Sequence, residues 1–152
     1  MNYFIRRQAI DYHKRDVNRT YPVFKNGVLV AYFSIAITSI RFTEESALDE
    51  RTRISSNIQL GIPKGAFIIG HFAKTKGTER GMIDVLLEMA KSVIRKAQKF
   101  VGGNIICLDC DNKKLEKIYL DHGFKVMGRS PEHIGGNFRR MFLLMRGRET
   151  QQ

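Results

Sequence analysis

A short loop between two predicted elements gathers residues that are suited to bind a phosphate group. The apolar segment 65–73 (GAFIIGHFA) is expected to form a strand, and a helix is expected after Gly81. The loop between them holds three cations: Lys74, Lys76 and Arg80. Gly77 and Gly81 let the backbone approach a ligand closely, and the free N–H groups of a helix N-terminus attract anions. The loop is therefore predicted to bind an anion, with an ordinary solvated loop as the alternative.

The helix after this loop has the clearest periodicity in the chain. Its apolar residues recur at steps of three and four: Leu86, Ala90, Val93, Ala97 and Phe100/Val101. Two acidic residues lie near its start and three basic ones near its end, as the helix dipole favours: Asp84, Glu88, Arg95, Lys96 and Lys99. Gly102-Gly103 ends the helix. The segment from Ile105 to Leu108 is apolar on both faces, which is typical of a strand in the middle of a sheet.

A second helix, which carries Tyr119, is expected after this strand. Asp111 or Asn112 is predicted to cap it, and Gly123 to end it. Four residues form its apolar face: Leu115, Ile118, Tyr119 and His122. A strand, a helix and a second strand in this order make a β-α-β unit, whose right-handed crossover implies parallel pairing.

The remaining segments add flanking strands and an N-terminal helix. The helix is expected from about Tyr3 to Asp16, and residues 44–53 fit either a helical turn or a mobile loop. Four flanking strands are expected, at residues 21–24, 28–40, 125–128 and 139–145. Asn26-Gly27 provides the turn of the first hairpin. We therefore predict one α/β (α+β) domain over residues 1–152, with a mixed, mostly antiparallel sheet around a central parallel β-α-β unit.

The composition is typical of a globular protein and argues against a membrane partner. Hydrophobic residues make up 43% of the 152 residues, which is enough for one domain with its own core. The longest apolar runs, such as Val28 to Ala36, are too short to span a bilayer. The first residues lack the long apolar stretch of a secretory signal, so the expected location is the cytoplasm.

Two cysteines form a C-x-x-C pattern at Cys107 and Cys110. On a strand, residues three apart point to opposite faces and lie about 10 Å apart along the chain, whereas a disulfide needs Cα atoms within about 7 Å. The sequence holds no second C-x-x-C or His pair to complete a zinc site. We therefore predict two reduced, packed thiols and no metal.

The net charge of +11 indicates a possible polyanionic partner. A coenzyme carries only a few negative charges, so this excess favours a larger partner such as RNA. A basic surface that is simply solvated remains the alternative.

The segment from Asn112 to Phe124 resembles the cofactor-binding core of the GCN5-related N-acetyltransferases (GNAT), through the pattern N-x-x-x-x-x-[apolar]-Y-x-x-x-G-F. Arg19-Thr20-Tyr21, Gly27, Ala31–Ser34 and the later V-G-G…C also resemble a subgroup of small bacterial and phage members. The resemblance covers about residues 20–146. It implies the acyl-CoA N-acyltransferase fold and acetyl-CoA as cofactor. The chain starts too late to include both the strand and the helix that usually begin this fold, so two alternatives stay open: the sequence is truncated at its N-terminus, or the fold lacks its first strand.

The resemblance also implies roles for individual residues. Tyr119 is expected near the thioester sulfur as the catalytic residue, and Asn112 is expected to contact the cofactor. The backbone of His71, Phe72 and Ala73 is expected to pair with the pantetheine arm. Six residues match the pyrophosphate loop: Lys76, Gly77, Thr78, Arg80, Gly81 and Met82. Thr78 stands where the family has Gln or Arg, and Ile83 where it has a second small residue, so Lys76 or Arg80 is expected to supply the missing charge.

The implied reaction is acetyl transfer to a primary amine, on aminoacyl-tRNA as in toxins or on a protein. The acceptor site is expected between residues 41–60 and 129–138, with an antitoxin and a second copy of the chain as further candidate partners. Five residues are candidates for the general base, and none is assigned: His71, Glu44, Glu45, Glu132 and His133. Two alternatives stay open. One is a nucleic-acid-binding module that stacks bases on Tyr21, Phe33 or Phe138, and the other is the same fold without activity.

Overall fold

The computed structural model of the chain describes residues 4–78, 80–129 and 137–145. Its strands are β1 (Arg19–Lys25), β2 (Val28–Ile40), β3 (Lys64–Lys74), β4 (Ile105–Cys110), β5 (Lys125–Arg129) and β6 (Arg139–Leu144). Its helices are a π-helical turn (Phe4–Gln8), α1 (Ala9–Lys14), α2 (Glu50–Ser55), α3 (Met82–Val101) and α4 (Lys113–Asp121). Every predicted strand is present. None of the described helices is both long and apolar enough to cross a membrane.

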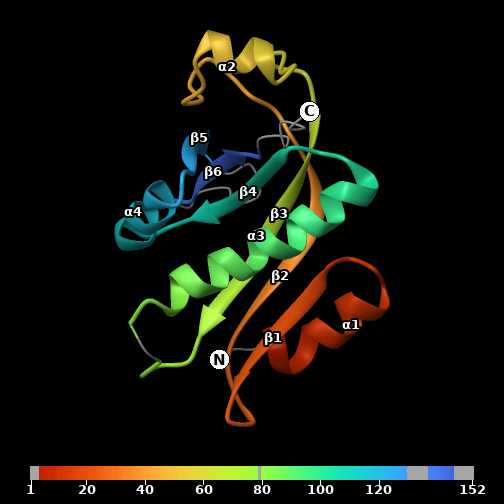
Figure 1. Ribbon diagram of the computed structural model, residues 1–152, viewed down its shortest axis with the longest axis vertical. Coiled ribbons are helices and arrows are strands. Elements are labelled where there is room, and N and C mark those ends of the chain that lie inside the picture. The colour runs from red at the N-terminus through yellow and green to blue at the C-terminus, as the bar shows by residue number, and fades with distance from the viewer. Residues whose placement is uncertain (1–3, 79, 130–136, 146–152) are drawn as a thin grey trace, which may run out of the picture.

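The six strands form one sheet in the order β1-β2-β3-β4-β6-β5 (Figure 1). Within the described residues, β3 and β4 pair in parallel and the four other pairings are antiparallel. The predicted mixed sheet with a central β-α-β unit is therefore confirmed. In this part of the chain β1 is an edge strand, as expected for a fold without its first strand.

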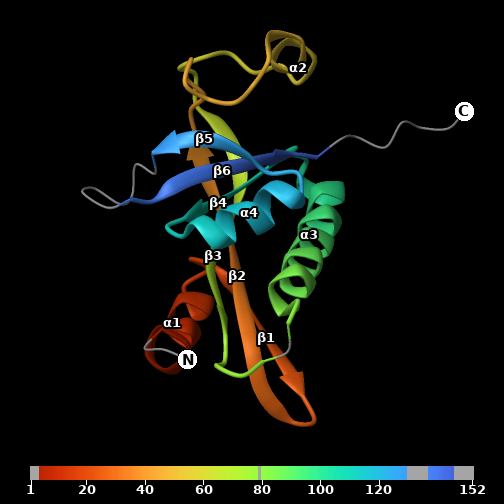
Figure 2. The same cartoon turned by 90° about the vertical axis from the view of Figure 1, so that its left-hand side faces the viewer.

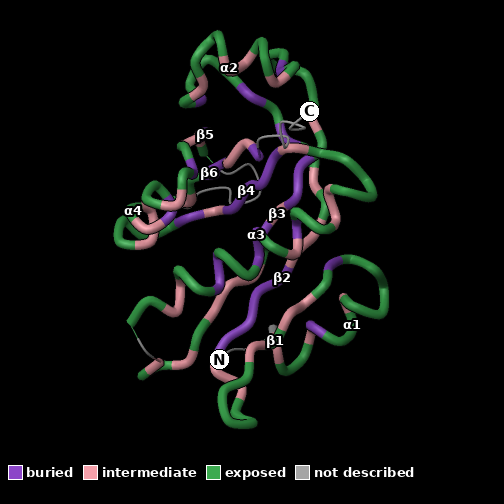
Figure 3. Tube along the Cα trace, viewed as in Figure 1, coloured by how far each residue is buried: buried purple, intermediate pink, exposed green. Residues whose placement is uncertain are grey.

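Helices cover both faces of the sheet. α3 and α4 pack on one face, where Leu87 and Tyr119 join alternate strand residues such as Ile69 and Leu108 in the largest core. α1 packs on the other face, where Ala9 contacts Tyr32. Figure 2 shows α1 and α3 on opposite sides of the sheet, and Figure 3 shows the buried residues concentrated along the central strands.

Local sequence signals explain where the main elements begin and end. Asn26 and Gly27 have φ values of 51° and 76°, which is the geometry of the tight hairpin turn expected between β1 and β2. At the end of α3, Gly102 has φ 74°, a conformation that favours glycine. Asn112 rather than Asp111 caps α4, because its side chain accepts hydrogen bonds from the N–H groups of Lys114 and Leu115.

Three details of the helices differ from the sequence prediction. The N-terminal helix begins as a π-helical turn and its α-helical part ends at Lys14, before Asp16. α2 begins at Glu50, because Asp49 accepts a hydrogen bond from the Thr52 N–H at 2.8 Å and so caps the helix there. Phe100 is 88% exposed and does not belong to the buried face of α3. It lies about 120° around the helix from Ile94, the last buried residue of that face.

Candidate active site

The two central strands part in the middle of the sheet. β3 and β4 pair over Phe67–Ile69 and Ile106–Leu108, and their described pairing ends there. Beyond this point β3 stays paired with β2, and β4 with β6. A cavity of about 450 Å³ lies where the strands part. An extended chain in this cavity would meet strand edges, which can hydrogen-bond to it.

A β-bulge in β3 lies at the same place. The pairing of β2 with β3 shifts register between Phe33 and Ile35, and the buried Ser34 hydroxyl accepts a hydrogen bond from the His71 N–H at 2.8 Å. A Cβ atom on Gly70 would lie only 3.2 Å from this hydroxyl, so the bulge leaves little room for a side chain there. Bulges often re-aim residues beside functional sites. The His71 N–H is therefore engaged by Ser34, and the predicted backbone contacts of Phe72 and Ala73 with a cofactor remain predictions.

Tyr119 lines the cavity from α4, as the sequence predicted for its helical face. The residue is 4% exposed. Burial raises the pKa of its phenol, and the nearby Cys110 and Asp111 raise it further. The phenol is therefore protonated at neutral pH. A free thiol has a pKa near 8.5, so a thiolate beside Tyr119 would receive a hydrogen bond from the phenol rather than its proton.

Both faces of the sheet contribute to the cavity wall. Tyr119 and Leu115 approach from the α4 side, whereas Tyr32 and Ile68 belong to the cores of the opposite face. The remaining lining residues are Ile69, Gly70, His71, Phe72, Asp109, Asp111 and Phe138. Residues from both faces of the sheet thus border the cavity.

His71 is the one described candidate base that lines this cavity; Glu44 and Glu45 do not line it. Burial lowers the pKa of the half-buried His71 imidazole, so its neutral form, which accepts a proton, is favoured. Glu132 and His133 lie outside the described residues.

The predicted border of the acceptor site is only partly found. Phe138 lines the cavity, but residues 41–60 do not. Most of this segment lies beyond the end of the sheet with α2 (Figure 1), so its prediction as a wall of the cavity is wrong. Residues 130–136 of the other predicted border are outside the described part of the chain.

The predicted phosphate loop leads directly into the N-terminus of α3. Gly77 and Gly81 have φ values of 81° and 88°, which favour glycine. No described side chain caps α3 at Gly81, so its first N–H groups are not covered by a capping side chain. Lys76 and Arg80 are exposed beside them. Thr78 instead closes the loop, because its hydroxyl donates to the Thr75 carbonyl. Met82 begins the helix, and an anion site with charges from Lys76 and Arg80 remains a prediction.

Asn112 lies beside the first cavity rather than in it. Its side-chain oxygen accepts a hydrogen bond from the Lys114 N–H at 2.8 Å, and its carbonyl accepts one from the Cys110 thiol at 3.2 Å. It lines a neighbouring cavity of about 720 Å³, which shares Asp111 and Phe138 with the first. The side-chain oxygen is thus occupied by the helix cap, and the predicted contact of Asn112 with a cofactor remains a prediction.

The two cysteines point to opposite faces of the sheet, as predicted. Cys110 packs in the core beneath α3 and α4, and Cys107 packs in the core of the other face. Both are buried free thiols. Burial also raises the pKa of Cys110, which makes it a poor nucleophile. Within the described ranges, no three His, Cys, Asp or Glu residues are grouped to hold a metal ion.

Two polar groupings were not predicted from the sequence. Arg140 and Asp109, opposite each other on β6 and β4, form a buried bidentate ion pair with distances of 2.9 and 3.0 Å. Arg140 lies between exposed Arg139 and buried Met141, so only the alternation of β6 could have indicated that it points inward. The second grouping joins His122 to α3 through Asp84, Glu88 and Lys91.

The aromatic residues proposed for base stacking are mostly engaged within the fold. Phe33 is 1% exposed and stacks on Tyr21, with ring centroids 5.0 Å apart. Phe33 therefore cannot stack on a base, and one face of Tyr21 is covered. Phe138 lines the two cavities next to α4. This arrangement weakens the alternative of a base-stacking module.

Solved structures of bacterial toxins are similar to this chain. The TM-score is 0.71 for AtaT complexed with acetyl-methionyl-tRNAfMet, with 17% identity over 93% of this chain and 79% of that chain. It is 0.68 for a tyrosine-to-phenylalanine mutant of KacT, with 19% identity over 90% of this chain and 78% of that chain. It is 0.63 for AtaTR bound with acetyl-CoA, with 18% identity over 93% of this chain and 78% of that chain. No protein-family model and no curated protein sequence matches the chain.

The chain has the GNAT fold. The similarity extends over 90–93% of the chain, at identities that support the fold alone. The cofactor site that the sequence predicted therefore remains a prediction.

Proposed function

We propose that this chain is a cytoplasmic, acetyl-CoA-dependent N-acetyltransferase that acts on a primary amine. The observation that carries the proposal is the cavity between β3 and β4, with the protonated phenol of Tyr119 in its wall. Two supports are independent of the fold similarity: the uncapped N-terminus of α3 after a loop with two exposed cations, and the cavity wall drawn from both faces of the sheet.

The described residues fit coenzyme A in three places. The edge of β3 at His71, Phe72 and Ala73 is suited to hydrogen-bond to the pantetheine arm. The phosphates would be held by the N-terminus of α3 and its preceding loop. The residues assigned to this second place are Lys76, Gly77, Thr78, Arg80, Gly81 and Met82. Asn112, at the mouth of the neighbouring cavity, is assigned a further contact.

Acetyl-CoA supplies the acetyl group as a thioester, so transfer forms a C–N bond to the amine, breaks the C–S bond and leaves a negative charge on sulfur. Tyr119 stabilises that charge by donating a hydrogen bond, because its raised pKa keeps the proton on the phenol. A backbone N–H near Phe72 is placed to polarise the carbonyl oxygen. His71, whose neutral form is favoured by burial, accepts the proton that the amine loses.

The acceptor that fits the charge of this chain best is an amine attached to RNA. The chain carries a net charge of +11, which attracts a polyanion. A structural neighbour, AtaT, was solved with acetyl-methionyl-tRNA, an acetylated aminoacyl-tRNA. We therefore propose aminoacyl-tRNA as the acceptor. Because AtaT was also solved with the C-terminus of an antitoxin, a protein partner of that kind is proposed as well.

Acetyl transfer to charged tRNA tests this function directly. The protein is incubated with labelled acetyl-CoA and a mixture of aminoacyl-tRNAs, and the acetylated amino acids are identified by mass spectrometry. We expect transfer at low salt that falls steeply as salt is raised, since phosphate contacts release counterions. Tyr119→Phe should slow transfer about a hundredfold without weakening coenzyme A binding. A variant with full activity would remove Tyr119 from the mechanism, and a protein that binds no coenzyme A would refute the function.

A further inference from the structure

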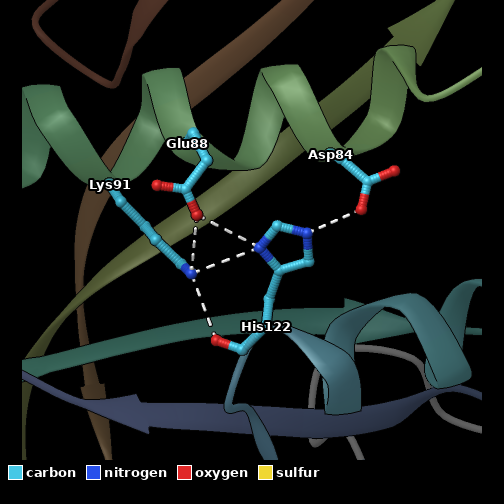
Figure 4. Close-up of polar contacts among 4 residues, drawn as sticks. All are labelled: Asp84, Glu88, Lys91 and His122. Carbon is cyan, nitrogen blue, oxygen red and sulfur yellow. Dashed lines mark hydrogen bonds and ion pairs between the residues drawn. The ribbon is translucent and has the colours of Figure 1, made fainter.

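Four charged or titratable side chains join the start of α3 to the end of α4 (Figure 4). The His122 ring lies between two carboxylates: its Nε2 is 2.7 Å from Asp84 Oδ1, and its Nδ1 is 3.2 Å from Glu88 Oε1. The Lys91 ammonium donates to Glu88 Oε1 at 3.2 Å and to the His122 carbonyl at 3.1 Å. The mechanism proposed above uses none of these four residues.

The position of Asp84 makes this cluster relevant to the cofactor site. α3 begins at Met82, so Asp84 lies in the first turn, at the end assigned to the phosphates. A carboxylate in the first turn stabilises a helix, but it repels a bound anion at the same N–H groups. Asp84 and Glu88 are also four residues apart on one face of the helix, where like charges destabilise it. An unpaired Asp84 would therefore weaken both the helix and the phosphate site.

The two carboxylates share the His122 ring, and Glu88 has a second, cationic partner in Lys91. Lys91 neutralises Glu88. Burial alone would raise the pKa of Glu88, but the hydrogen bonds and charges of Lys91 and His122 outweigh it and lower that pKa. The Lys91 side chain is 7% exposed and its ammonium lies 5.9 Å from the centre of the Phe124 ring, so it is held in place. The donor that remains for Asp84 is the His122 Nε2–H.

We propose that His122 is a positioning residue for the cofactor: it holds the Asp84 carboxylate against α4 and away from the phosphates at the start of α3. The His122 side chain is only 14% exposed, and the His122 carbonyl accepts a hydrogen bond from Lys91. The position of the ring is therefore fixed, and the ring can restrain the Asp84 side chain, which is 54% exposed. The inference rests on the proposed function, because it assumes that the start of α3 binds the phosphates of coenzyme A.

The first test is the coenzyme A affinity of His122→Leu, measured by calorimetry at low salt. Loss of the Nε2–H frees Asp84, and we expect the dissociation constant to rise about five- to tenfold. The difference from the unchanged protein should shrink as salt screens the repulsion. His122→Asn, whose shorter amide does not reach Asp84, serves the same purpose if the leucine variant does not fold.

The decisive test is rescue by a second substitution. Adding Asp84→Asn to His122→Leu removes the charge that His122 restrains, so affinity should return to within about twofold of the original. Asp121→Asn is the matched control. Asp121 is an exposed residue at the end of α4, so its substitution removes one negative charge outside the cluster and should not restore binding. Rescue by both substitutions equally, or by neither, would overturn the proposal.

A ligand without phosphates separates charge from helix position. Pantetheine, used as a competitor, should bind His122→Leu and the unchanged protein equally, because it carries no phosphate near Asp84. An equal loss for pantetheine and coenzyme A would show that His122 only holds α4 in place, and would overturn the electrostatic role while leaving the proposed function intact. Failure of the unchanged protein to bind coenzyme A would refute both proposals.

Discussion

The unit from β3 to α4 and the segment from Arg41 to Pro63 are built in opposite ways. In the β3–α4 unit, Leu86, Leu87 and Ala90 of α3 are completely buried. In the other segment, α2 has no buried residue and its Ile54 is 65% exposed. This segment is attached through Phe42 and Ile58, which enter a core, and through Leu48, which packs against the same core. The β3–α4 unit can therefore hold a ligand in a defined geometry, whereas α2 contributes only to the solvent-exposed surface of the protein.

The polar contacts of the β3–α4 unit and of residues 41–63 also differ in where they lie. The α2 segment reaches the rest of the sheet through Ala47, whose N–H donates to the Val126 carbonyl at 2.9 Å, and through Ser46, whose hydroxyl donates to the Met127 carbonyl at 3.0 Å. These two bonds cover part of the outer edge of β5, which would otherwise be open to pairing. By contrast, the β3–α4 unit has a polar contact beside the cavity, where the His71 N–H of β3 donates to Ser34 of β2.

The largest expected effect is on stability and lies in the buried unit. Leu87→Ala should lower the free energy of unfolding by about 2–5 kcal/mol, because it leaves a cavity beneath α3 in the main core. Urea unfolding followed by circular dichroism measures it. A loss of less than about 1 kcal/mol would show that the core under α3 is not well packed, and would remove the contrast with the α2 segment.

The next effect is on activity and concerns the cavity. His71→Gln should slow acetyl transfer about a hundredfold at neutral pH, since glutamine does not accept the proton of the amine. Burial lowers the pKa of His71, so the unchanged protein should remain active to a lower pH than an ordinary histidine would allow. Its rate should then fall as the pH drops through that lowered pKa, because His71 becomes protonated.

The pH dependence of transfer distinguishes His71 as a base from His71 as a wall of the cavity. The acid limb of the rate profile should disappear in His71→Gln. Tyr119 should add no alkaline limb up to pH about 10, the usual pKa of a tyrosine, because its own pKa is raised. A profile of unchanged shape in His71→Gln would assign proton transfer to another group, such as water.

The features that the sequence predicted correctly lie mostly in the buried β3–α4 unit. Steps of three and four between apolar residues predicted α3, and the burial of β4 on both faces followed from its uninterrupted apolar run. The Tyr119 position was predictable because it lies on the apolar face of α4. These are local signals, since each depends on residues within one element.

Contacts between distant elements could not be predicted in this way. The bond between Ser34 and the His71 N–H joins residues 37 positions apart, and that between His122 and Asp84 joins residues 38 apart. Each depends on how the strands or helices are placed in three dimensions. For α2, the capping residue Asp49 was available as a signal, but without an apolar face nothing favoured a helix over a loop.

The smallest expected effect is in the α2 segment. Ile54→Ser should change the free energy of unfolding by no more than about 0.5 kcal/mol, because the side chain is 65% exposed and packs in no core. It should also leave acetyl transfer to a small amine unchanged, since residues 41–60 do not line the cavity with Tyr119. Unfolding in urea and initial rates at saturating acetyl-CoA measure the two quantities. A loss of activity restricted to tRNA acceptors would instead place the α2 surface against the RNA, because only a large acceptor extends from the cavity to the end of the sheet.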